Sequence, residues 1–579
     1  MNKIFRVIWN NVTQTWVAVS ELQPAKGKTK SVAAAVVSAV SLMAATEASA
    51  ALTTGTDSTG YKTAMNGVSG MEGQHWELVF GPNATTTAKS IAIGQDSYSA
   101  DASVALGDGA AAGKQKIGEF NGYSVAVGVN AKAPGRQTVA IGNSANGTEA
   151  ATHSVIIGQN SGSTAAGVVV TGHEAHAHAL YGIASGVRAH VTDAAQGGIA
   201  IGQNSTSSGA DAVAVGNAST AGQNKDVAVG PGAQAVGSWS TAVGNEAQAL
   251  KADASAFGNE AVATHQDATA LGAHSEAKEN KTTAVGRGAK ALALEATSTG
   301  YNAQALKEWT TAIGANATAA KEQASAFGHG ALANETASTA VGVASTANGV
   351  GSFAGANNAT ANGTGSVALG LDAATVKDGD TAVGKSSVAK GGNSSAFGTE
   401  TTAGGVASLA AGYQANATGP STVALGEAAT ASGSRDVAIG RQANATAGNS
   451  VALGNEANST GGHSTAVGDG AQSTGGWSTA VGNGANASKT DANAFGNGAK
   501  ALETNTTALG SHAQATHSGS VALGYRSETA AANPTNTATV GTGSSALTYS
   551  GFAGNQPTSV VSVGNGTNKR QIVNVAAGR

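Results

Sequence analysis

The residues best suited to metal chemistry in this chain are four histidines between residues 173 and 190. His173, His176 and His178 fall within one short stretch, and His190 follows. Two histidines at positions i and i+2 share one face of a strand, and imidazole nitrogen is a preferred ligand of zinc. Counting from Gly172, however, His176 and His178 take the fourth and sixth positions of a repeat, whose side chains are expected to point outward. The pattern therefore favours a solvated polar face and predicts no metal site.

A second candidate is a loose G-x-G-x-x-A pattern at residues 286–291, which recurs in part at residues 496–498. A dinucleotide-binding fingerprint requires a strand, a turn and then a helix. Here the residues that follow alternate as in a strand, so the pattern does not indicate a nucleotide cofactor. The chain offers no nucleophile with a base and an orienting partner, no G-x-S-x-G elbow and no carboxylate pair set apart from the repeat. We expect neither enzyme activity nor a cofactor.

The composition limits the classes of partner and of fold. The chain has 31 basic and 35 acidic residues and a net charge of −4, which argues against a nucleic-acid partner. Glycine reaches 82 residues while aromatic residues make up only 4%, so one large globular core would be hard to build. There is no cysteine. Disorder is disfavoured because Val, Ile, Leu and Phe recur in strict phase before each glycine.

A five-residue unit that ends in glycine recurs along most of the chain, as in residues 240–244. Its glycine returns every fourteen residues from Gly202 to Gly342 and, after one slip, from Gly370 to Gly524. A fixed short period is typical of solenoids whose units stack on their neighbours. We expect each glycine to adopt a backbone angle that a Cβ atom would penalise. The glycines assigned this structural role are Gly244, Gly258, Gly272, Gly286, Gly314, Gly328, Gly426, Gly440, Gly454 and Gly482.

Each repeat divides into two short alternating segments, which predicts two β-strands per coil. Before Gly244, Thr241 and Val243 share one strand face and are expected to point inward, which leaves Ala242 on the opposite face. After the glycine, the small residues at positions three and five, such as Ala247, are expected inside, and the polar residues at positions two, four and six outside. Stacked in register, the coils predict an all-β fold, a parallel β-roll of about thirty coils and on the order of 150 Å in length.

The outward alanine in the centre of each unit predicts self-association. A face made of small apolar side chains is poorly suited to water, and so thin a coil buries little area by itself. Identical chains packed on this face would supply the missing contacts. The order of the symmetry does not follow from the repeat.

The first fifty residues have the features of a secretory signal. Lys26, Lys28 and Lys30 precede an apolar run at residues 31–45, and small residues lead to a predicted cleavage between Ala50 and Ala51. The run is shorter than the roughly 20 apolar residues that span a membrane. We assign residues 1–50 to the signal peptide, 51–90 to a cap on the first coil, 91–525 to the repeats and 526–579 to a connector and the start of a neck.

Three parts of the chain resemble trimeric autotransporter adhesins of the YadA-like family. Residues 1–10 and 16–22 are similar to the extended signal-peptide region of Gram-negative autotransporters. The units at residues 449–454 and 519–524 resemble the head repeat, and residues 570–578 resemble the neck that leads into a coiled-coil stalk. The three matches occur in the order that the family has.

The resemblance implies a left-handed parallel β-roll, a homotrimer, and an adhesive head beyond the outer membrane at the cell surface of a Gram-negative bacterium. In the family such heads bind host matrix proteins, collagen among them, or mediate autoaggregation. No heptad segment and no amphipathic strands for a membrane barrel come after the neck-like run in this sequence, so we expect the chain to be a fragment, a truncated gene product or the head of a split protein. Contact with the membrane is therefore expected only through an anchor that this chain lacks.

Two classes of function remain open on the sequence. The first is a surface adhesin head. The second is a non-adhesive solenoid, either a spacer or another secreted β-solenoid such as an ice-binding protein. Ice binding favours a flat, uniform threonine array, whereas the slot four residues after each glycine is heterogeneous. From Gly244 onward that slot holds Gln248, Val262, Glu276, Lys290, Gln304 and Thr318.

Overall fold

A computed structural model describes residues 77–87, 89–113 and 122–576, together with the backbones of four earlier strands. Two of these, β1 (Phe5–Asn10) and β2 (Thr15–Ser20), pair as an antiparallel hairpin. The predicted cleavage point between Ala50 and Ala51 lies outside the described residues. Within the described part, no helix is long and apolar enough to cross a membrane.

One coil consists of a three-residue strand that ends just before the glycine and a two-residue strand at positions four and five after it. In a representative coil these are β27 (Thr241–Val243) and β28 (Gln248–Ala249). In the next coil they are β29 (Ser255–Phe257) and β30 (Val262–Ala263). Each strand pairs in parallel with its counterpart one coil away, so that Thr241 lies beside Ser255.

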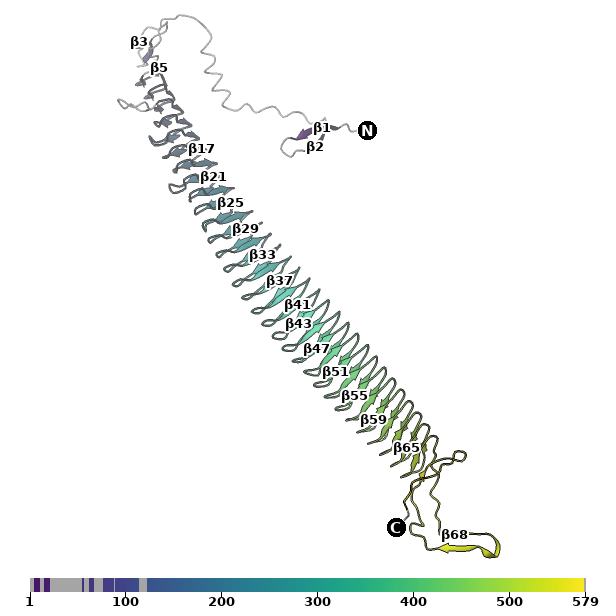
Figure 1. Cartoon of the computed structure of the whole chain (residues 1–579). Helices are drawn as coiled ribbons and strands as arrows, with labels where there is room; N and C mark the ends of the chain where they lie inside the picture. Colours follow the sequence, from purple (N-terminus) through teal and green to yellow (C-terminus); the bar gives the residue numbers. More distant parts are fainter. Residues whose placement is uncertain are drawn as a thin grey trace.

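The stacked coils form one long rod with about 31 turns, seen end to end in Figure 1. Three-residue strands make up the first sheet, which runs along one side of the rod. Two-residue strands make up the second sheet on the other side. The prediction of an all-β parallel roll with a fourteen-residue repeat is confirmed. At about 4.8 Å per coil the rod measures on the order of 150 Å.

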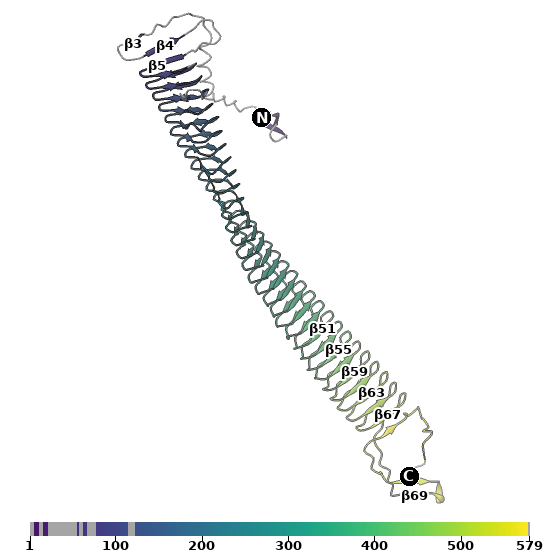
Figure 2. The same cartoon turned by 60° about the vertical axis from the view of Figure 1, so that its left-hand side comes forward.

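Both ends of the rod depart from the repeat. Parallel pairing begins at β5 (Glu77–Gly81), one coil before residue 91, and two antiparallel strands, β4 (Lys62–Asn66) and β3 (Gly55–Thr56), continue the first sheet outward. At the other end β67 (Val521–Leu523) pairs with β70 (Val561–Ser562). Between these two strands the chain leaves the rod as a hairpin of β68 (Thr537–Val540) and β69 (Leu547–Ser550), which is visible in Figure 2.

Mostly small side chains fill the space between the two sheets. In the representative coil, Ala247 and Ala249 of the second sheet and Ala254 and Ala256 of the first are fully buried. The same four slots hold mainly Ala, Ser and Thr along the described rod, and occasionally Gly, Val, Ile or Asp. The inward prediction for positions three and five after the glycine is therefore correct.

The prediction for the strand before each glycine is wrong by one residue. Ala242 is fully buried, whereas Thr241 and Val243 are partly exposed on the outer side of the sheet. A one-residue shift in phase moves every side chain of a strand to the other face. The fourteen-residue coil is too short to hold large residues from both strands inside, so the alanine points inward and the Val, Ile, Leu or Phe points out. The central alanines are consequently not the surface on which sister chains pack.

The repeat glycines are required by the close approach of successive coils. All ten glycines of the predicted set have φ between 125° and 139°. They also stack on one another: a Cβ atom on Gly258 would come within 2.6 Å of the carbonyl group of Gly272. Any larger residue would therefore face both a disfavoured backbone angle and a clash with main-chain atoms that cannot move away.

Buried aspartates replace the usual Ser or Thr at one inward slot in three coils. Asp226, Asp380 and Asp436 are fully buried. In the last of them, Oδ2 accepts a hydrogen bond from the Gly433 amide at 2.7 Å. Its Oδ1 accepts from the amide and the hydroxyl of Ser450 at 2.9 and 2.7 Å. Each carboxylate thus joins two successive coils through donors that would otherwise be buried without a partner.

Candidate adhesive surface

The outward residue just before each repeat glycine creates an apolar stripe along the rod. The parallel register places Phe257 of one coil beside Leu271 of the next, and so on. Their exposed fractions lie between 36 and 46% in a set that contains Phe257, Leu271, Ile313, Phe327, Val341, Leu369, Phe397, Leu453, Leu509 and Leu523. The stripe is interrupted only at Thr171, Ser185, Thr299 and Gly355 within the described coils, and soluble monomers rarely expose large apolar patches. The stripe therefore has the character of an interface between chains.

The outer side of the second sheet forms a polar face of mixed composition. Gln248, Val262, Glu276 and Lys290 succeed one another in adjacent coils, as the sequence predicted. The Glu276 carboxylate forms ion pairs with the ammonium groups of Lys278 at 2.5 Å and Lys290 at 3.2 Å. Partial burial alone would raise the pKa of Glu276, but the hydrogen bonds and charges of the two lysines together outweigh it and hold the pKa below its usual value.

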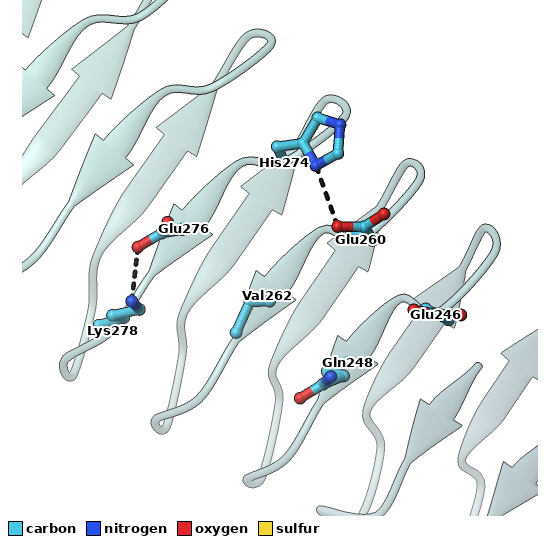
Figure 3. Close-up of a pocket in the computed structure, with 7 residues that line it drawn as sticks. All are labelled: Glu246, Gln248, Glu260, Val262, His274, Glu276 and Lys278. Atoms are coloured by element: carbon cyan, nitrogen blue, oxygen red, sulfur yellow. Dashed lines mark ion pairs between the residues drawn. The ribbon is translucent and has the colours of Figure 1, made fainter. Parts of the chain in front are cut away.

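A shallow cleft of about 310 Å³ opens on this polar face. Figure 3 shows its lining, in which a bond from His274 Nδ1 to Glu260 Oε2 measures 3.2 Å. The lining residues are Glu246, Gln248, Glu260, Val262, His274, Glu276 and Lys278. Its charged groups bond mainly to one another, and it holds no nucleophile beside a base. Its chemistry is that of a polar contact surface for another molecule.

The histidines identified in the sequence gather on the same outer side of the second sheet. His176 and His190 are directly paired on adjacent strands, and His178 lies next to both, with ring centroids 5.4–6.5 Å apart. Burial, followed by the charge of His178, lowers the pKa of His176 and of His190. No group of metal ligands is present in the described part of the chain, and His173 faces Glu174 at 3.9 Å.

The glycine-rich pattern at residues 286–291 leads into a strand and not a helix. Its last two residues form β34 (Lys290–Ala291), a regular member of the second sheet. The related pattern at residues 496–498 is followed by β64 (Lys500–Ala501) in the same way. Neither pattern can therefore present a helix N-terminus to a phosphate, as the dinucleotide fingerprint requires.

One set of surface residues was not singled out from the sequence. Two residues before each strand of the first sheet, the chain turns through a left-handed conformation. In five coils this turn slot holds an exposed aromatic side chain. These residues, the aromatic edge, are Tyr123, Tyr181, Trp239, Trp309 and Trp477, with φ between 54° and 66° and exposed fractions of 47–65%. Their fixed distance from the repeat glycine was the signal that could have revealed them.

Comparison with known proteins gives two matches to family models. Residues 1–50 match the extended signal peptide of the type V secretion system. The YadA head domain repeat matches thirteen segments between residues 122 and 527, which together cover more than half of the chain. No curated protein matches.

The two family matches occur in the order expected of an exported adhesin, and the second coincides with the coils of the rod. The family and its fold are those of adhesins, a class without enzyme activity. The outer apolar stripe agrees with the homotrimers that heads of this type form in general. The extended signal indicates export from the cytoplasm. This chain therefore belongs to the YadA-like trimeric autotransporter adhesins.

Proposed function

We propose that this chain is the ligand-binding head of a homotrimer on the surface of a Gram-negative bacterium. It would attach the cell to host matrix proteins, such as collagen, or to host cells, and would mediate autoaggregation. The observation that supports this proposal best is the apolar stripe, because it leaves the polar face and the turns as the surfaces available to a ligand.

Trimer formation along the stripe would remove its exposed apolar side chains from water. Phe257 and Leu271 are each more than one-third exposed in the single chain, and residues of the same kind recur along the rod. At the C-terminal end Ile572, Val573 and Val575 are about 70% exposed, which would suit the contacts of a shared neck. Three identical surfaces packed around one axis would bury all these side chains in one symmetric interface.

The heterogeneity of the polar face supports a binding role. Adjacent coils present Gln248, Val262, Glu276 and Lys290 in the same slot, so the face varies along the rod although the core does not. Specific recognition of a protein requires such variation in charge and shape. Ice binding fits less well, because even the outward Thr column of the first sheet is flanked by irregular neighbours such as Phe257 and Leu271.

The proposal is tested with the purified full-length chain. Light scattering coupled to size-exclusion chromatography should give three times the mass of one chain. The trimer should bind immobilised collagen or another matrix protein in a saturable manner, and an unrelated solenoid of similar length serves as the control. A monomer at micromolar concentration would contradict the assembly. A stable trimer that binds no matrix protein and no cells would favour the spacer.

A further inference from the structure

We infer that the aromatic edge is a row of carbohydrate-binding platforms that recognise neutral pyranose units of glycans. The inference names a ligand class for the proposed adhesin and therefore rests on the proposed function. It starts from the presence of exposed aromatic residues in the left-handed turn slot. Three of the aromatic residues are tryptophans, and the slot belongs to the edge of the rod and not to the apolar stripe.

Tryptophan is an unfavourable residue for this slot on backbone grounds alone. Trp239, Trp309 and Trp477 have φ of 55°, 56° and 54°. A bulky side chain rarely adopts this left-handed conformation, which Gly, Asn and Asp occupy more easily. In other coils the slot indeed holds residues such as Gly379 and Asn393. Strained residues that the surrounding structure holds in place cluster at functional sites.

Packing does not account for these tryptophans either. Their exposed fractions are 60, 47 and 63% in chain order, so much of each ring faces solvent. The Trp239 ring lies 5.8 Å from the Lys225 ammonium, and the Trp477 ring stacks on His463 with centroids 5.5 Å apart. Both partners come from the preceding coil. They cover the ring on that side only.

The residue that succeeds each tryptophan in the stack supplies hydrogen-bonding groups. One coil further on, the turn slot holds Asp253 after Trp239, Gln323 after Trp309 and Asp491 after Trp477, and all three are exposed. The same arrangement occurs after Tyr123, whose successor is the exposed Gln137. Tyr181 is followed by Gly197 and lacks this group. Four of the five aromatic residues are thus paired with a carboxylate or a carboxamide.

An aromatic platform beside a carboxylate or carboxamide matches the chemistry of a pyranose ring. The axial C–H groups of the sugar form an apolar face that packs on an aromatic ring. The hydroxyl groups around its rim donate to the oxygen atoms of Asp or Gln, which can accept two such bonds. The platform is held in place by the ladder: the Trp239 amide donates to the Asn224 carbonyl at 2.9 Å, and the Asp253 amide to that of Ser238 at 3.1 Å.

Repetition along a rod suits a ligand that itself repeats. A single open platform binds one sugar weakly, because it encloses only one face of the ring. Several platforms on one chain, multiplied by the chains of a trimer, can engage a dense glycan layer at once. Such multivalency raises the apparent affinity by about 10²–10⁴ without any new contact.

The test uses the full-length chain and albumin that carries either β-galactosyl or β-glucosyl groups. Surface plasmon resonance should show saturable binding of at least one of them. The triple variant Trp239→Asn, Trp309→Asn and Trp477→Asn should reduce the apparent affinity at least tenfold. Because Asn is well suited to a left-handed turn, its melting temperature should equal or exceed that of the unchanged chain. Tyr301→Asn, which removes an exposed aromatic residue from a different slot, is the control and should leave binding unchanged.

Several results would overturn the inference. The first is that neither glycosylated albumin binds in a saturable manner. The second is that the triple variant binds as strongly as the unchanged chain. The third is that the unchanged chain binds a proline-rich peptide and not the sugars, and that the triple variant loses this binding. If the chain binds matrix proteins but neither albumin, the carbohydrate inference fails and the adhesin proposal stands. If it binds none of these probes, both fail.

Discussion

Replacement of Ala242 by aspartate should disrupt the rod locally, whereas the same change at Val243 should not. The methyl group of Ala242 is fully buried between the sheets, and so are those of its neighbours Ala228 and Ala256. An aspartate there would bring a carboxylate into a layer whose nearest hydroxyl, that of Ser240, already donates to the buried Asp226. An uncompensated buried charge costs about 3–5 kcal/mol, and overpacking adds about 1–3 kcal/mol. In a solenoid this loss falls mainly on the altered coil and its neighbours.

Val243 lies on the outer side of the same strand, so an aspartate at this position can reach water in a single chain. Substitutions on exposed surfaces usually change the free energy of unfolding by less than about 0.5 kcal/mol. In a trimer packed along the apolar stripe, by contrast, three carboxylates would meet at one level of the axis. Val243→Asp should therefore weaken the association of chains and leave the coil itself intact.

Hydrogen exchange of two backbone amides separates these effects. The Gly244 amide donates to the Val229 carbonyl at 2.8 Å, and the Gly258 amide donates to the Val243 carbonyl at 2.7 Å. Ala242→Asp should reduce the protection of both amides, and light scattering should show fewer trimers for Val243→Asp. Glu246→Lys, in an exposed turn, serves as the control and should be nearly silent. Equal loss of amide protection for the two aspartate variants in dissociated chains would refute the assignment of faces.

Three further predictions concern the glycines, the buried aspartates and the histidines. Gly258→Ala should lower the free energy of unfolding by more than about 1 kcal/mol and reduce the local melting temperature, because the added Cβ atom would meet the next coil. Gly470→Asn should be tolerated, because Gly470 has φ 62° and free space around it. Asp436→Ala leaves two amides and a hydroxyl without their acceptor and should destabilise by about 1–3 kcal/mol in a urea titration, and an unchanged midpoint would contradict this account. Folding lowers the pKa of His176 and of His190. Their contribution to the free energy of unfolding is therefore retained at a pH above the ordinary histidine pKa of 6.5 and decreases as the pH falls below it. The double replacement by Asn should flatten that part of the stability profile measured by circular dichroism.

The buried slots and the outward slots of a coil differ in how much their residues vary along the rod. Ala247 and Ala249 face a wall of other small residues, and every coil repeats that constraint. The outward slots of the second sheet face solvent and vary from Gln248 to Val262 between neighbouring coils. Function can therefore change along the rod without any change in the core, as the aromatic edge illustrates.

The amino-acid sequence by itself determined the coil, the stack and the family. A glycine every fourteen residues, two alternating segments and the extended signal were sufficient, because only a short turn at fixed spacing can return the chain to the same register. Alternation alone, however, gives two possible faces for each strand, and both sets in residues 241–243 are apolar enough to be buried. Only the tertiary structure decided between them, since the gap between the sheets is filled mainly by alanine and other small residues, and holds Val or Ile in only a few coils, such as Val170 and Ile156. The same structure decided that the tryptophans of distant coils share one edge, a relation that exists only once the coils are stacked.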